Sequence, residues 1–260
     1  LINLHELIFE DEQWFFTMDL IEGTDFFSYI CSSPALGAAT FLAPSRNIEP
    51  KLPARNDDGV EQVAVDPERW IRLRDALRQL ADGLCALHAM GKLHRDLKPS
   101  NVLVTAAGKV VILDFGIVMD MSADTDHHTF ENMVGTPAYM AVQQALGEQA
   151  SPADDWYSVG VMLYEALTGR LPFEGTALQV LTRKQREDPP LPRTIAANVP
   201  ADLEELCMQL LRRVPCERPS GSDVLRAHTK INALIYLYKF RAHTKINALI
   251  YLYKFNSIRS

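Results

Sequence analysis

The sequence predicts an α+β fold in which short strands come first and helices make up most of the remainder. Two short apolar runs on either side of Glu10–Glu12 favour a β-hairpin near the N-terminus. From Asp66 onward, apolar residues recur every three or four positions, which is typical of helices that cover a core. Strands followed by a loop-rich centre and then by helices indicate a mixed, mainly helical architecture. With 260 residues, of which 47% are hydrophobic, the chain is long enough to bury a core.

The N-terminal part of the chain divides into a hairpin, a short helix and a long connection. The hairpin takes up most of residues 1–22, and Gly23 ends it. Residues 25–31 then favour a short helix. Between residues 32 and 66 the composition shifts to Pro, Ala, Asn and Asp without a sustained period, which predicts a long surface connection.

A long helix follows this connection. Asp66, Pro67 and Glu68 form a helix-start signal with proline in the first turn, and Gly91 supplies the stop. The apolar residues between them share one helical face: Leu73, Ala76, Leu77, Leu80, Leu84 and Leu87. Arg72, Arg74, Arg78 and Asp82 occupy the other faces.

The second half of the chain predicts two more strands and three helices. Residues 101–105 and 109–113 read as strands joined by a turn around Ala107 and Gly108. A polar stretch at 120–132 predicts a loop. Helical patterns then cover residues 156–168, 176–187 and 201–213, separated by proline-rich turns.

Composition excludes several classes of function. A net charge of −7 and a pI near 5.5 argue against a nucleic-acid-binding surface, which would be basic. No apolar run approaches the roughly 20 residues of a membrane span. The four cysteines have no paired spacing, so we expect reduced thiols and a cytoplasmic location.

Two short motifs carry residue types that phosphoryl transfer requires. His94-Arg95-Asp96 follows the long helix, with Lys98 and Asn101 within the next five residues, and Asp114-Phe115-Gly116 follows a predicted strand. Phosphoryl transfer needs a carboxylate for the attacking hydroxyl, cations for the phosphate charge and oxygen ligands for Mg²⁺. Both motifs in this order and spacing supply those three functions.

With these motifs the chain resembles the eukaryotic-type serine/threonine protein kinases, and bacterial members in particular. HRDLKPSN at 94–101 resembles the catalytic loop, and DFG at 114–116 resembles the metal-binding segment. GTPAYMAVQQ at 135–144, DDWYSVGVMLYEALTGRLPFEG at 154–175 and ERPSGSDVL at 217–225 resemble further family motifs.

The resemblance implies a protein-kinase-like fold and a matching division of the chain. Residues 1–22 would be a remnant of the N-lobe sheet, with two or three strands and the hinge. Residues 23–225 would form the helical C-lobe, with a long insertion at about 32–66, and residues 226–260 a tail of unknown structure. The implied cofactors are ATP and Mg²⁺, with Mn²⁺ possible. The implied partner is a protein substrate with a Ser or Thr acceptor, and no nucleic acid or membrane span is expected.

The resemblance also implies roles for the residues that match the catalytic motifs. Asp96 would be the catalytic base, and Lys98 would contact the γ-phosphate. Asn101, which shares the catalytic loop, and Asp114 would be the metal ligands.

Further residues of the resemblance concern the nucleotide. Met18 would be the gatekeeper, and the backbone of Asp19 and Ile21 would meet the adenine edge.

A third group of implied roles concerns protein substrate and support. Arg95 would allow control by phosphorylation, and Thr136 would lie beside the catalytic loop. Asp155 would hold that loop through its backbone amides. Where the family has Glu, this chain has Gln143. We therefore expect Arg218 to lack its counter-charge, and the segment at 135–144, which resembles the family's substrate-docking segment, to be looser.

Two departures from the family leave alternatives open. Three features of the family would precede Leu1: the glycine-rich phosphate loop, the VAIK-type lysine and the glutamate that pairs with this lysine. We therefore expect a chain truncated in the N-lobe. Residues 226–240 recur unchanged at 241–255. The alternatives to an active kinase are a catalytically silent binding module and a gene fragment without independent function.

Overall fold

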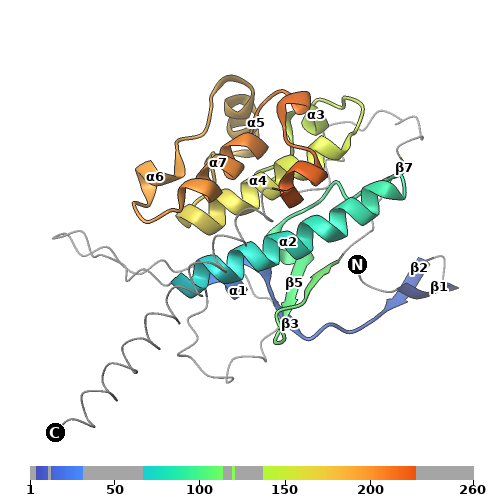
Figure 1. The fold of residues 1–260 in the computed structure, drawn as a ribbon. Helices are drawn as coiled ribbons and strands as arrows, with labels where there is room; N and C mark the ends of the chain where they lie inside the picture. Colours follow the sequence, from blue (N-terminus) through green and yellow to red (C-terminus); the bar gives the residue numbers. More distant parts are fainter. Residues whose placement is uncertain (1–3, 11–12, 32–66, 114–118, 121–136, 227–260) are drawn as a thin grey trace, which may run out of the picture.

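The structure is a computed structural model that describes residues 4–10, 13–31, 67–113, 119–120 and 137–226. The predicted connection at 32–66, nearly all of the predicted loop at 120–132 and the repeat beyond Arg226 lie outside these residues. The order of elements is the one that the sequence predicts, with strands first and helices last (Figure 1).

The predicted N-terminal hairpin is confirmed. Strand β1 (Leu4–Glu10) pairs with β2 (Gln13–Met18) in an antiparallel register that places Glu10 opposite Gln13. Figure 1 shows this hairpin standing apart from the helices.

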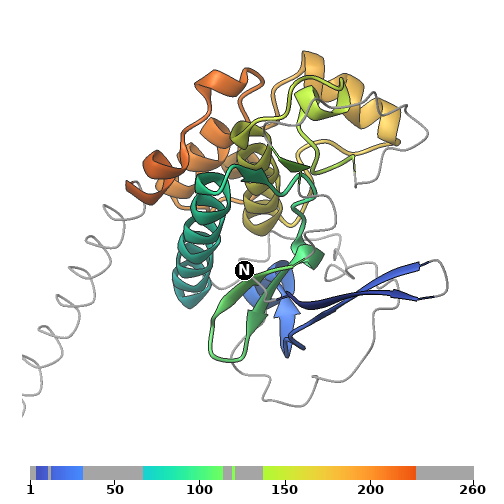
Figure 2. The same cartoon turned by 90° about the vertical axis from the view of Figure 1, so that its right-hand side faces the viewer.

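A second, three-stranded antiparallel sheet joins the centre of the chain. Strand β3 (Gly23–Asp25) pairs with β5 (Val102–Thr105), which pairs with β6 (Val110–Ile112). Gly108, with φ of +75°, forms the predicted turn between β5 and β6, a conformation that favours glycine. Helix α1 (Phe26–Cys31) follows β3, and Asp25 caps it by accepting a hydrogen bond from the Ser28 amide at 2.9 Å. Figure 2 shows β5 and β6 extending from the helical part next to α1.

The predicted long helix is α2 (Pro67–Ala89), and all six of its predicted apolar positions are buried. Gly91 ends it at φ of +70°. The opposite faces are not uniformly exposed. Arg74 is only 8% exposed, and its Nη2 donates to both carboxylate oxygens of Asp202 of α7, at 2.8 and 3.0 Å.

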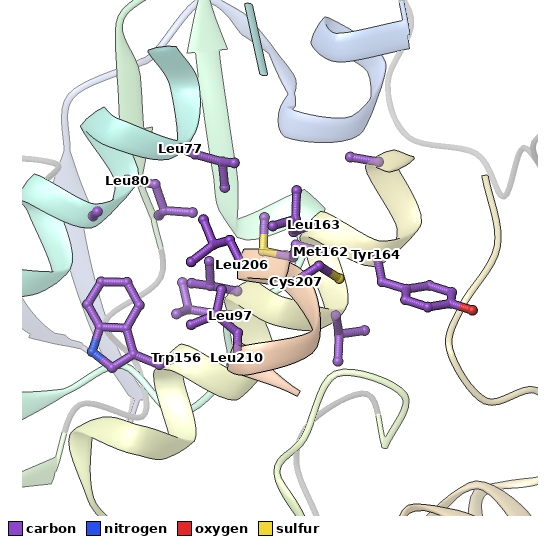
Figure 3. Packing of buried hydrophobic residues seen from close by; sticks show 14 of the residues in the cluster. Leu77, Leu80, Leu97, Trp156, Met162, Leu163, Tyr164, Leu206, Cys207 and Leu210 are labelled. Atoms are coloured by element: carbon purple, nitrogen blue, oxygen red, sulfur yellow. The ribbon is translucent and has the colours of Figure 1, made fainter. Parts of the chain in front are cut away.

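Helix α4 (Pro152–Thr168) is the centre of the core. It begins four residues before the predicted start, because Ser151 and Asp154 form a reciprocal capping box with Pro152 in the first turn. Helix α7 (Ala201–Leu210) crosses it at Gly160, where an added Cβ would lie 2.8 Å from the Cβ of Leu210. Figure 3 shows the apolar side chains of these helices and of α2 meeting in one cluster.

Several short elements surround this core, and the sequence predicts few of them. Helix α5 (Ala177–Arg186) matches the prediction closely, with Thr176 as its N-cap, whereas α7 ends three residues early. The remaining elements are β4 (Lys92–Leu93), η1 (Pro99–Asn101), β7 (Met119–Asp120), α3 (Val142–Ala145), α6 (Pro192–Ile195) and η4 (Pro215–Glu217). Asp120, predicted to begin a loop, pairs with Lys92 across β7 and β4.

Two predictions from composition can be compared with the fold. All four cysteines are free thiols, as predicted. No helix in the described part of the chain is long and apolar enough to cross a membrane.

Candidate active site

The loop at residues 94–101 runs from β4 to β5, and a buried carboxylate from another part of the chain holds its first turn. Asp155 of α4 accepts hydrogen bonds from the amides of His94 and Arg95, at 2.9 and 2.8 Å. His88 Nε2 lies 2.8 Å from the same carboxylate. These are the backbone contacts that the sequence implies for Asp155, whose side chain is only 1% exposed.

The backbone at Arg95 is in a conformation that non-glycine residues rarely adopt. Its φ is +66°, in the left-handed region, where a Cβ costs energy. The surroundings hold this conformation from two sides. Asp155 accepts from the Arg95 amide, and Gln144 of α3 donates from Nε2 to the Arg95 carbonyl oxygen at 2.7 Å. The next residue, Asp96, therefore leaves the turn in a fixed direction.

Asp96, Lys98 and Asn101 come together at the end of this turn. Lys98 Nζ donates to Oδ2 of Asp96 at 2.7 Å, and Asn101 Nδ2 donates to the same oxygen at 3.1 Å. Asn101 Nδ2 also donates to the Asp96 backbone carbonyl at 2.8 Å. The Asp96 side chain is 11% exposed and that of Lys98 is 25% exposed. The result is a solvent-accessible carboxylate with a cation and an amide beside it.

The same loop holds the chain just before the predicted metal ligand. Leu113 donates from its amide to the carbonyl oxygen of Asn101 at 2.8 Å, and its own carbonyl lies 2.8 Å from His94 Nε2. The chain thus lies beside Asn101 at Leu113, the last described residue before Asp114. Asp114 itself, like Thr136, lies outside the described residues.

The oxygen of the Asn101 amide suits a hard divalent cation. Its Nδ2 is committed to Asp96, so Oδ1 remains for another partner besides Ser100, whose hydroxyl lies 3.5 Å away. Amide and carboxylate oxygens are the ligands that Mg²⁺ prefers. Within the described ranges no cluster of three or more His, Cys, Asp or Glu side chains suitable for a metal is present.

The predicted nucleotide-contacting residues lie on the link between the hairpin and β3. Met18 ends β2 and is 42% exposed, and Asp19 pairs with His5 at 2.7 Å. Ile21 is half-buried. This link reaches the loop through β3, which pairs with β5 and contacts η1.

The segment before α3 is held by a buried cation that the sequence analysis missed. Lys184 of α5 is 1% exposed, and its Nζ donates to the carbonyl oxygens of Pro137, Ala138 and Met140 at 2.9, 2.6 and 2.7 Å. Burial lowers the pKa of Lys184 to about 7. The helical spacing from Val180 to Lys184 was the available signal, because it places this lysine on the buried face of α5.

The expectation that Arg218 lacks a counter-charge is wrong. Its Nη2 donates to Gln143 Oε1 at 2.8 Å, and its Nη1 lies 3.7 Å from the carboxylate of Asp154. Asp154 belongs to the capping box of α4, so its second contact was not evident from the family pattern. Burial lowers the pKa of Arg218, and Asp154 opposes that shift. The pKa of Asp154 is raised, mainly by burial.

Comparisons with known proteins identify one family. The family model of the protein kinase domain matches residues 1–229. Serine/threonine-protein kinase PknA of Mycobacterium tuberculosis (strain ATCC 25177 / H37Ra) is 40% identical over 144 residues, which cover 55% of this chain and 33% of that protein. Serine/threonine-protein kinase PkaA of Streptomyces coelicolor is 34% identical over 233 residues, which cover 87% of this chain and 36% of that protein. Serine/threonine-protein kinase Pkn1 of Myxococcus xanthus is 42% identical over 156 residues, covering 58% and 22%. The chain thus spans about a third of these relatives' length or less.

Proposed function

This chain belongs to the protein kinase family, and from that premise we propose that it transfers the γ-phosphate of ATP to serine or threonine hydroxyls of proteins. Members of this family use ATP and a divalent metal ion. The observation that carries the proposal is the contact of Lys98 and Asn101 with the Asp96 carboxylate, on a loop whose backbone Asp155 holds.

Asp96 is the proposed base of the reaction. Its carboxylate accepts the proton of the acceptor hydroxyl while the hydroxyl oxygen bonds to the γ-phosphorus and the bond to the β–γ bridging oxygen breaks. Lys98 Nζ, 2.7 Å from Asp96, offsets negative charge on the phosphoryl oxygens next to that carboxylate. Asn101 fixes the Asp96 carboxylate through Nδ2.

Asn101 Oδ1 and Asp114 are the proposed ligands of the metal ion, which we propose to be Mg²⁺. The metal would neutralise part of the charge on the ATP phosphates. Met18 as gatekeeper, and the backbone of Asp19 and Ile21 at the adenine edge, complete the proposed nucleotide site.

The remaining features of the proposal concern substrate and location. Thr136 beside the catalytic loop, and the segment joined to Gln143 and Arg218, would receive the protein substrate. Arg95 would link activity to phosphorylation. We further propose a cytoplasmic location and no nucleic-acid partner, in keeping with the net charge of −7.

Two measurements on the full chain test this function together. The first is a thermal melt with and without Mg-ATP, in which ATP at a hundredfold its Kd should stabilise by about 2.7 kcal/mol. The second is transfer of labelled phosphate from ATP to dephosphorylated casein, with Mg²⁺ and Mn²⁺ in separate arms. Asp96→Asn should abolish transfer and keep the ATP-dependent shift, because the amide keeps the shape but accepts no proton.

The possible outcomes separate the proposed function from its alternatives. Transfer that needs Asp96 supports the kinase. A melting shift without transfer by the unaltered chain would contradict the catalytic proposal and favour a silent binding module, whereas neither signal would favour a fragment without independent function.

A further inference from the structure

Lys184 is a buried cation that the proposed chemistry does not use. It projects from α5, the side chain is 1% exposed, and within the described part of the chain no carboxylate lies within ion-pair distance of it. A buried ammonium without a counter-ion costs free energy unless its N–H groups are satisfied. The N–H groups of Lys184 must therefore find acceptors other than carboxylates.

The three hydrogen bonds of Lys184 all go to one short stretch of backbone. When Lys184 is protonated, its three N–H donors match the carbonyl oxygens of Pro137, Ala138 and Met140, at 2.6–2.9 Å, so no donor is left for water. Three carbonyls converging on a single nitrogen fix the path of four consecutive residues.

This stretch of backbone is the described part of the segment that would receive a protein substrate. Residues 137–140 lead directly into α3, where Gln144 reaches back to the Arg95 carbonyl beside Asp96. Tyr139 of the same stretch donates from its hydroxyl to Glu165 of α4 at 2.6 Å. Lys184 is thus the contact that ties α5 to a segment bordering the catalytic loop.

We propose that Lys184 is a positioning residue for the protein substrate, which holds the backbone of residues 137–140 in the conformation that a peptide binds. This inference rests on the proposed kinase function and extends it to specificity for the protein partner rather than for ATP. Lys184 touches neither reacting group, so its loss weakens binding of protein substrate and leaves nucleotide binding unchanged.

The charged and titratable groups around Lys184 belong to α4, the end of η4, the segment at 137–140 and α5 itself. The Tyr157 ring of α4 lies 5.1 Å from Nζ, and the Arg218 guanidinium covers the same ring at 4.9 Å. The segment at 137–140 contributes Tyr139, and α5 itself contributes Arg183 and Arg186 near its end. Asp154 lies beyond Arg218 and pairs with it. None of these supplies a negative charge to Lys184 directly, so the carbonyl oxygens are its principal partners.

The test replaces Lys184 by methionine, which fills similar volume without N–H donors. Steady-state phosphorylation of casein by the full chain should show a KM for casein raised at least fivefold, with the KM for ATP within twofold of the wild type. Arg186→Met, on the same helix and exposed, is the matched control and should change neither constant. If Lys184→Met yields too little folded protein, Lys184→Gln keeps two donors and should give an intermediate KM for casein.

Hydrogen exchange supplies a second readout that needs no catalysis. Amides of residues 138–147 should exchange at least tenfold faster in Lys184→Met than in the wild type, and those of α2 should keep their rates. An unchanged KM for casein in an active Lys184→Met variant, or equal rises in both KM values, would overturn the positioning role alone. An inactive wild type would instead refute the proposed function, and the positioning role with it. Unchanged exchange at 138–147 would show that the three carbonyl contacts do not hold the segment.

Discussion

The Arg218 guanidinium donates a hydrogen bond to Oε1 of Gln143 at 2.8 Å, and the other end of the same glutamine amide donates to the carbonyl oxygen of Arg213 at 2.7 Å. Gln143 therefore joins an arginine donor to a backbone acceptor. A carboxylate at this position could accept from Arg218. It could not donate to the Arg213 carbonyl oxygen, because it carries no N–H group. The glutamine is thus matched to its surroundings here.

Gln143→Glu should not raise the stability of the chain, contrary to what the family pattern suggests. The new charge would meet Arg218, which already has Asp154 at 3.7 Å, while a carboxylate oxygen would face the Arg213 carbonyl. We expect the free energy of unfolding to fall by about 1 kcal/mol, from the unmade hydrogen bond. Urea unfolding measures this change. A rise in the melting temperature would show that the family's carboxylate is the better partner in this fold.

Asp155→Asn should destabilise the chain and impair the catalytic loop. The carboxylate accepts from two backbone amides and lies 2.8 Å from His88, whereas an asparagine would turn N–H groups toward donors. Leaving one buried donor unsatisfied costs about 1–3 kcal/mol. Asp82→Asn on α2, half-exposed at 52%, is the control and should cost under about 0.5 kcal/mol. Comparable losses in the free energy of unfolding of the two variants would mean that Asp155 does not support the loop.

Arg74→Met should lower the free energy of unfolding more than the loss of an exposed ion pair on the same helix. The Arg74 side chain is 10% exposed, but its partner Asp202 is 34% exposed, so solvent screens part of the interaction. We expect a loss of about 1–2 kcal/mol in the free energy of unfolding, below the range for fully buried pairs. Arg78→Met, 41% exposed and paired on the same helix, should lose less than about 0.5 kcal/mol. The prediction is refuted when chemical denaturation gives the same value for both.

The stability of the wild type relative to Lys184→Met should increase with pH above neutrality. The pKa of folded Lys184, about 7, lies below the value of 10.5 for an ordinary lysine. Between these values the unfolded chain binds more protons, so the free energy of unfolding rises with pH. Between pH 6.5 and 9 the wild type should gain on the order of 2–3 kcal/mol over the variant, since each pH unit contributes about 1.4 kcal/mol where only the unfolded chain binds the proton. A constant difference across this range, in urea titrations, would place the pKa of Lys184 near that of an exposed lysine.

The long regular elements could be predicted from the sequence because one local pattern determines each of them. The periodicity of α2 and its proline and glycine boundaries needed no tertiary information, and neither did the hairpin turn after Glu10. The motif spacing likewise brought Asp96, Lys98 and Asn101 to one loop.

The contacts that were missed depend on residues far apart in the sequence. Lys184 lies 44–47 positions from its carbonyl partners, and the ion pair of Arg74 with Asp202 spans 128 positions. Short elements such as β4 and α3 have too few residues for a period to appear. Asp154 was overlooked as a partner of Arg218 because its helix-capping contact is local and its second contact is not.

The attachment of the catalytic loop to Asp155 also determines when this loop can take its final conformation during synthesis of the chain. A ribosome makes the chain from its N-terminus, so His94 and Arg95 leave it about sixty residues before their acceptor does. Until α4 has emerged, the nascent chain lacks the carboxylate that accepts from the Arg95 amide in the left-handed turn. The part of the protein proposed to carry the chemistry therefore reaches its final shape only after α4 has been made.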